Sequence, residues 1–168
     1  MAKWSFSNAS WTPTAVAAGA TMTANGACFL QGGSSTQYLM TSEIYMGGNA
    51  AASAVNDMVL SRDSTVAVTS ITLGTNGKNA ALDPATAALA APQVPGFSAT
   101  TMPQASTTLQ MLALSFNAFG GIVRWVAYPG EEIRTVGASA SLGELSLSCS
   151  SITGTPGALS STWIYEPL

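Results

Sequence analysis

Apolar and polar residues alternate in short segments along much of the chain, most clearly toward its carboxy-terminal end. Leu145, Leu147 and Cys149 share one parity there, while serines occupy the positions between them. Successive side chains of a β-strand point to opposite faces, so this pattern predicts a strand with one buried face. The same alternation over residues 109–117 predicts a second such strand. The leucines assigned to the core by this reasoning are Leu112, Leu114, Leu145 and Leu147.

Turn-forming residues separate the predicted strands. Gly74 to Gly77 contains an Asn-Gly pair, and Pro129-Gly130 predicts a two-residue hairpin between the strands on either side of it. About eight short strands punctuated by Gly, Pro and Asn predict an all-β protein, a single β-sandwich with a jelly-roll-like topology. The strands are expected at residues 37–46, 54–61, 65–73, 109–117, 122–128, 131–136, 142–150 and 160–165.

One long stretch, residues 78–106, has no sustained periodicity. Its only helical signal is Asp83 and Pro84 ahead of an alanine-rich run that ends before Pro92, which predicts one short helix or turn. Loops of this length are commonly functional or partly disordered. We therefore expect an irregular, Pro-rich insertion over one end of the fold.

The amino-terminal stretch combines three large aromatic residues with a low-complexity Ala/Thr/Gly run from Thr14 to Gly26. Two interpretations are open: an edge strand tucked into the core, or an extended arm that docks on a neighbouring molecule, since Trp and Phe are enriched at interfaces. We therefore divide the chain into an arm or edge segment at residues 1–26 and a sandwich domain at residues 27–168. The candidate partner contacts are Trp4, Phe6 and Trp11.

Composition favours a protein that assembles. Hydrophobic residues make up 47% of the 168 residues, an ordinary share, whereas charged residues make up only 8%, against about 25% in typical soluble domains. A surface of Ser, Thr, Asn and Gly repels itself weakly and loses less on desolvation than a charged one. This indicates a subunit of an assembly; a secreted Ser/Thr-rich module is the alternative.

Charge and hydropathy argue against two classes of partner. The five basic residues are scattered and the net charge is −3, so we expect no direct nucleic-acid binding. No run of 18 apolar residues predicts a transmembrane helix, and the start of the chain lacks the apolar segment of a secretory signal. The chain is therefore expected to be made and used inside a cell, unless a signal has been removed.

Catalytic and metal-binding signals are weak. The chain has no histidine, and Cys28 and Cys149 form no CxxC motif; free thiols are favoured, with one long-range disulfide as the alternative. Isolated carboxylates on strands are more often solvated or paired with arginine than catalytic. The Arg124 side chain is expected to point outward. We predict no catalytic, cofactor or metal site. The carboxylates that could converge across strands are Glu43, Glu144 and Glu166.

Several segments together resemble small β-rich structural proteins of tailed bacteriophages. The pattern covers Leu114 to Ile133, Gly143 to Leu147 and Trp163 to Glu166, and the region from Gln37 to Arg62 is similar too. The resemblance implies a virion component such as a capsid decoration (cement) protein with a jelly-roll-like fold. It contains no site motif, so it assigns no functional residue.

The expected partners follow from this resemblance: the major capsid protein and further copies of the chain, most simply as a trimer, since closed rings suit threefold positions of a shell. The expected location is the capsid surface of the virion, after synthesis in the host cytoplasm. One alternative is a phage tail or neck subunit. The other is a carbohydrate-binding sandwich, which should present an exposed aromatic strip drawn from Trp11, Trp125, Tyr128 and Trp163.

Overall fold

The structure, a computed structural model, describes residues 2–13, 25–32, 34, 36–64, 72–86, 94–98, 104–135, 146–151 and 157–168. Over these residues it consists of strands and their connections, with no helix, which confirms the all-β prediction. The strands are β1 (Trp4–Trp11), β2 (Asn25–Gln31), β3 (Leu39–Gly48), β4 (Val55–Ser64), β5 (Gly77–Ala81), β6 (Val94–Ser98), β7 (Gln104–Asn117), β8 (Ile122–Val126), β9 (Ile133–Thr135), β10 (Ser146–Ser151) and β11 (Leu159–Pro167).

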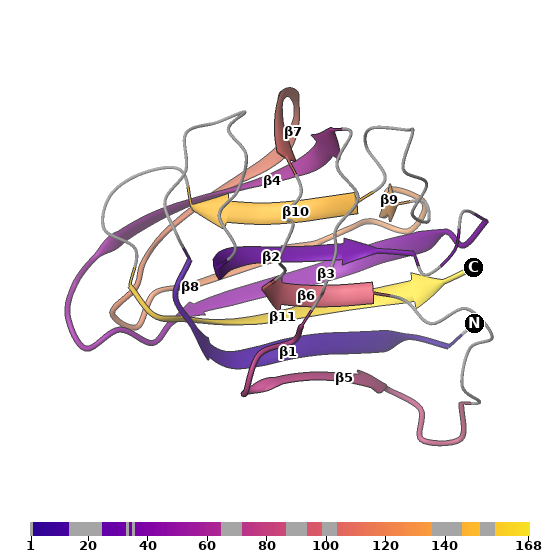
Figure 1. The fold of residues 1–168 in the computed structure, drawn as a ribbon, viewed down its shortest axis with the longest axis horizontal. Helices are drawn as coiled ribbons and strands as arrows, with labels where there is room; N and C mark the ends of the chain where they lie inside the picture. Colours follow the sequence, from indigo (N-terminus) through magenta and orange to yellow (C-terminus); the bar gives the residue numbers. More distant parts are fainter. Residues whose placement is uncertain are drawn as a thin grey trace.

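The strands form two antiparallel sheets. The first has the order β5-β1-β11-β3-β8, with β9 also paired to β3, and the second has the order β6-β2-β10-β4-β7. In Figure 1, β5, β1 and β11 run side by side, and both chain ends lie at the same end of the molecule.

The early strands pair with the late strands in mirrored order. β1 pairs with β11, β2 with β10, β3 with β8 and β9, and β4 with β7. Two further ladders, β11 with β3 and β10 with β4, join these pairs into the two sheets. Strands β5 and β6 come from the connection between β4 and β7, and they extend each sheet beyond β1 and β2.

The hydrophobic core lies between the sheets. Phe6 of β1 is fully buried, and its ring centroid lies 5.2 Å from that of Trp163 on β11 and 5.6 Å from that of Phe97 on β6. Both sheets therefore contribute to one apolar cluster. Of the predicted core leucines, Leu114 is buried and Leu112 packs against the cluster while half-buried. Residue 145 and the side chain of residue 147 lie outside the described part of the structure.

The amino-terminal residues belong to the first sheet. β1 lies between β5 and β11, so it is an inner strand, and Phe6 and Trp11 are buried in the core of their own chain. The extended-arm interpretation is therefore wrong for residues 4–11, because burial against β6 and β11 already occupies these aromatic rings. The low-complexity run lies outside the described residues, apart from Asn25 and Gly26 at its end.

The predicted insertion at residues 78–106 contains most of β5, all of β6 and the start of β7. Backbone pairing with β1 and β2 forms β5 and β6, which explains why side-chain alternation did not reveal them. Asp83 forms a turn, since its carboxylate accepts a hydrogen bond from the Ala85 backbone N–H at 2.9 Å. The alanine-rich run beyond Thr86 and most of the strand expected at residues 65–73 lie outside the described residues.

The prediction of a hairpin at Pro129-Gly130 is wrong. A turn does occur there: the Glu131 N–H donates to the Tyr128 carbonyl at 2.9 Å, and Gly130 has a φ of 90°. However, β8 and β9 do not pair with each other across it. Both pair with β3, at Glu43–Gly47 and at Leu39–Thr41, as two successive pieces along one long strand.

Candidate interaction surface

The outer face of the first sheet is the side that points away from the core. Along β3 the inward side chains Ile44 and Met46 are buried, while Glu43, Tyr45 and Gly47 alternate with them. The register places these three positions opposite residues of β11 on one side and of β8 on the other. The resulting rows are Ser160–Gly47–Ile122, Thr162–Tyr45–Arg124 and Ile164–Glu43–Val126.

β8 gives this face an exposed apolar border. Ile122 is 80% exposed and Val126 is 45% exposed, on either side of Arg124, and exposure continues to alternate as far as Tyr128, which is 76% exposed. The intervening Trp125 is half-buried and packs against the core. The outward direction predicted for Arg124 is confirmed. We call Ile122, Arg124 and Val126 the β8 stripe.

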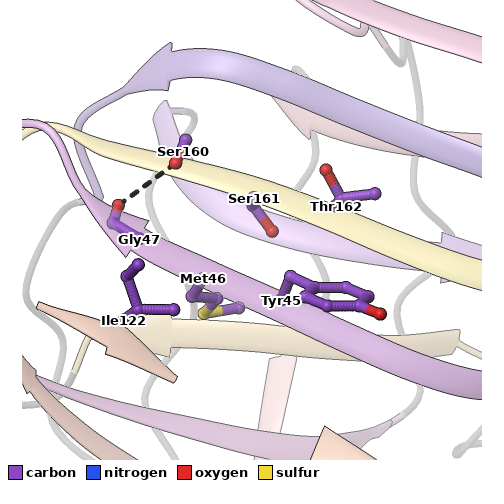
Figure 2. A pocket seen from close by; sticks show the side chains of 7 residues that line it. All are labelled: Tyr45, Met46, Gly47, Ile122, Ser160, Ser161 and Thr162. Atoms are coloured by element: carbon purple, nitrogen blue, oxygen red, sulfur yellow. Dashed lines mark hydrogen bonds between the residues drawn. The ribbon is translucent and has the colours of Figure 1, made fainter. Parts of the chain in front are cut away.

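A shallow hollow of about 170 Å³ opens beside the β8 stripe. It forms where Gly47 lacks a side chain, and the Ser160 hydroxyl donates a hydrogen bond to the Gly47 carbonyl at 3.4 Å. Figure 2 shows that the lining comes from three adjacent strands: β11 contributes the hydroxyl-bearing side chains of residues 160–162, β3 lies in the middle, and β8 contributes Ile122. The lining residues are Tyr45, Met46, Gly47, Ile122, Ser160, Ser161 and Thr162.

A compact charged cluster lies next to the hollow. Arg124 Nη2 lies 2.9 Å from Glu43 Oε2, and its guanidinium lies 5.0 Å from the centre of the Tyr45 ring. The Tyr45 hydroxyl donates a hydrogen bond to the same carboxylate oxygen. This bond, followed by that from Arg124, lowers the pKa of Glu43, and the bond to the carboxylate raises the pKa of Tyr45. The one cation on this border is thus already neutralised within the chain.

The predicted partner contacts do not lie on this face. Trp4 is half-buried, whereas Phe6 and Trp11 are core residues, and Trp11 packs on Phe97 with 5.4 Å between ring centroids. None of the three presents a free aromatic surface comparable to that of Tyr128. The sequence left both interpretations of these three residues open, because an aromatic residue buried within its own chain and one buried by a partner give the same pattern.

The aromatic strip required by the carbohydrate alternative is not formed by the residues expected for it. Trp11 and Trp163 are buried, and Trp125 points toward the core, so only Tyr128 of the four is well exposed. Tyr45, which sequence reasoning missed, is outward-facing, but the guanidinium of Arg124 lies over its ring.

The other sequence candidates include two carboxylates on adjacent strands of the first sheet and the two cysteines of the second. Glu43 is paired with Arg124, whereas Glu166 lies opposite Met40 in the β11–β3 ladder, and residue 144 is outside the described part. Cys28 is buried, and the backbone of Cys149 lies directly opposite it in the β10–β2 ladder; the side chain of Cys149 is not described.

Comparisons with protein-family models, with curated proteins and with solved structures find no match for the chain. Among the residues that the structure describes, there is no helix both long and apolar enough to cross a membrane.

Proposed function

We propose that this chain is a structural protein of a tailed bacteriophage virion, a decoration protein that binds the assembled capsid through the outer face of its first sheet. The observation that carries the binding role is the β8 stripe together with the adjacent hollow. Exposed apolar side chains border a face that is otherwise rich in hydroxyls, in a chain with only 8% charged residues.

The proposed fold is a jelly roll. The mirrored pairing of early and late strands supports it, because a long two-stranded ribbon that folds over itself produces this arrangement. In such a ribbon the ladders β11–β3 and β10–β4 close the roll. Double-sheet jelly rolls occur in viral capsid domains and also in lectins, so the fold alone does not choose between the two functions.

The energetics of the outer face favour a protein partner. Burying a large aliphatic side chain fully is worth about 1.5–3 kcal/mol, so covering Ile122 and Val126, which are 80% and 45% exposed, would contribute about 2–4 kcal/mol. Covering the stripe would desolvate Arg124, whose side chain is 54% exposed, but the ion pair with Glu43 makes this cost smaller than for an unpaired guanidinium. The hollow at Gly47 offers a place for a side chain of the partner.

Decoration proteins stabilise a shell by binding its assembled form in preference to its separate parts. The proposed partners are the major capsid protein and further copies of this chain, and the proposed location is the capsid surface. A tail or neck subunit would share the same physical properties and would differ in its position and copy number. The carbohydrate-binding alternative is less favoured, since Trp11, Trp125 and Trp163 do not form an exposed platform.

The test is an add-back binding experiment with phage particles made without this chain. Purified protein should co-sediment with the particles, and Ile122→Asp should weaken binding at least about tenfold, which corresponds to 1.4 kcal/mol. Leu82→Asp is the matched control, because Leu82 is 53% exposed and lies beyond β5, at the opposite edge of the first sheet from β8.

Equal binding by both variants would contradict the assignment of the face. Absence of binding by the unmodified protein, combined with specific binding to an oligosaccharide array, would instead support the carbohydrate alternative.

A further inference from the structure

The edges of the two sheets differ in how well they are protected against pairing with another strand. Over the described residues the edges are formed by β5 and by β8 followed by β9 in the first sheet, and by β6 and β7 in the second. An edge strand exposes unpaired backbone N–H and C=O groups, and natural proteins protect such edges with short strands, charges or proline.

Three of these edges carry such protection. β5, β6 and β8 are each five residues long. β5 carries the exposed Lys78, β6 contains Pro95, which has no backbone N–H to donate, and β8 has Arg124 at its centre.

β7 lacks these protections. It is 14 residues long and contains no charged residue, no proline and no glycine. Irregular pairing with β4 is confined to the part before Leu112; from Leu112 to Asn117 the ladder with β4 is continuous. This half of β7 is therefore a regular, uncharged edge, which is the kind that recruits another strand.

The core is also incompletely closed beside β7. Leu112 and Phe116 face the core from this edge but are only half-buried, as is Trp125 on the neighbouring β8. At the opposite side Phe97 of β6 is 4% exposed and covers Phe6 and Trp11. An additional strand beside β7 would extend the second sheet over the open side.

We propose that β7 of one copy pairs in antiparallel fashion with β7 of a second copy, so that the two second sheets become one continuous sheet. Antiparallel self-pairing about a twofold axis brings a segment against its own copy, so a charge near the axis would face an identical charge. β7 carries no charged residue, so no such repulsion would oppose the pairing. A second copy also offers no other edge without charge or proline among the four described here.

This inference specifies the self-association included in the proposed function, and it predicts a twofold contact in place of the threefold ring expected from the sequence. It does not depend on what the assembled protein binds.

The test compares two Ala→Lys variants on edge strands by sedimentation velocity and native mass spectrometry over a range of protein concentrations. Ala113 on β7 and Ala80 on β5 are both exposed, so lysine at either position can remain in solvent in the single copy. The unmodified protein and Ala80→Lys should each sediment as two copies. Ala113→Lys should sediment as one copy at the same concentration, with an unchanged far-ultraviolet circular dichroism spectrum.

Hydrogen exchange provides a measurement that needs no variant. Dilution of the unmodified protein should accelerate amide exchange in Leu112–Asn117 while leaving β11 unchanged. A single copy at all concentrations, a threefold assembly, or an Ala113→Lys protein that still forms two copies would overturn the pairing. If Ala113→Lys becomes a single copy while the unmodified dimer ignores phage particles, the β7 contact stands and the proposed function fails.

Discussion

Replacing Phe6 by alanine tests whether the amino-terminal strand belongs to the core. Phe6 is fully buried, and its ring lies within 6.0 Å, centroid to centroid, of the rings of Trp163, Tyr165 and Phe97. Removal of a fully buried phenylalanine side chain costs about 3–5 kcal/mol, because transfer energy is lost and a cavity remains. A domain of this size typically has a free energy of unfolding of about 5–15 kcal/mol.

We therefore expect Phe6→Ala to lose a large fraction of the free energy of unfolding. At about 2–4 °C per kcal/mol for a chain of this length, the Tm of Phe6→Ala should fall by about 6–20 °C. Chemical denaturation followed by tryptophan fluorescence and by circular dichroism would measure the free energy of unfolding directly.

Phe119→Ala is the matched control, since Phe119 is 62% exposed in the turn before β8 and should change stability by less than about 0.5 kcal/mol. If Phe6→Ala were as stable as this control, Phe6 would not be a core residue, and the arm interpretation would return. Deletion of residues 2–11 should likewise unfold the chain rather than release a folded domain.

Three further results are expected. Leu114→Ala should lower the free energy of unfolding by about 2–5 kcal/mol in urea titrations, because Leu114 is buried; an unchanged midpoint would contradict its place in the core. Gly48→Ala should lower Tm in a thermal melt, because a Cβ there would lie 2.1 Å from the Ala118 carbonyl oxygen; a tolerated alanine would mean that the two backbones are farther apart. Arg124→Met should destabilise the protein at neutral pH but not in acid. Because the pKa of Glu43 is lowered in the folded protein, the ionised carboxylate stabilises the fold above the ordinary pKa of 4.5, and this contribution is lost as pH falls and the carboxyl is protonated. A stability difference between the variant and the unmodified protein that does not change with pH would exclude the coupling between Arg124 and Glu43.

Alternation predicted the strands well where one face is buried and the other is exposed. β8 is the clearest case, since Val123 and Trp125 pack against the core while Ile122 and Arg124 face outward. Sequence reasoning failed where pairing does not depend on alternation. β5 contains no large apolar residue, and its strand conformation is formed by backbone pairing with β1.

Turn residues predicted where the chain changes direction but not which strand it joins. Pro129-Gly130 does form a turn, yet the strands around it both pair with β3, because β3 is long enough to accept them in succession. The candidate interaction surface could not be predicted from the sequence either. Glu43 and Arg124 are 81 residues apart, and only the register of β3 with β8 brings them together.

The central claim, that the chain decorates a phage capsid, is tested most directly by counting its copies in purified virions with quantitative mass spectrometry. The account predicts copies in a fixed ratio to the major capsid protein and of the same order of abundance. A handful of copies per particle would indicate a tail or neck subunit, and absence from the particles would contradict a virion role altogether.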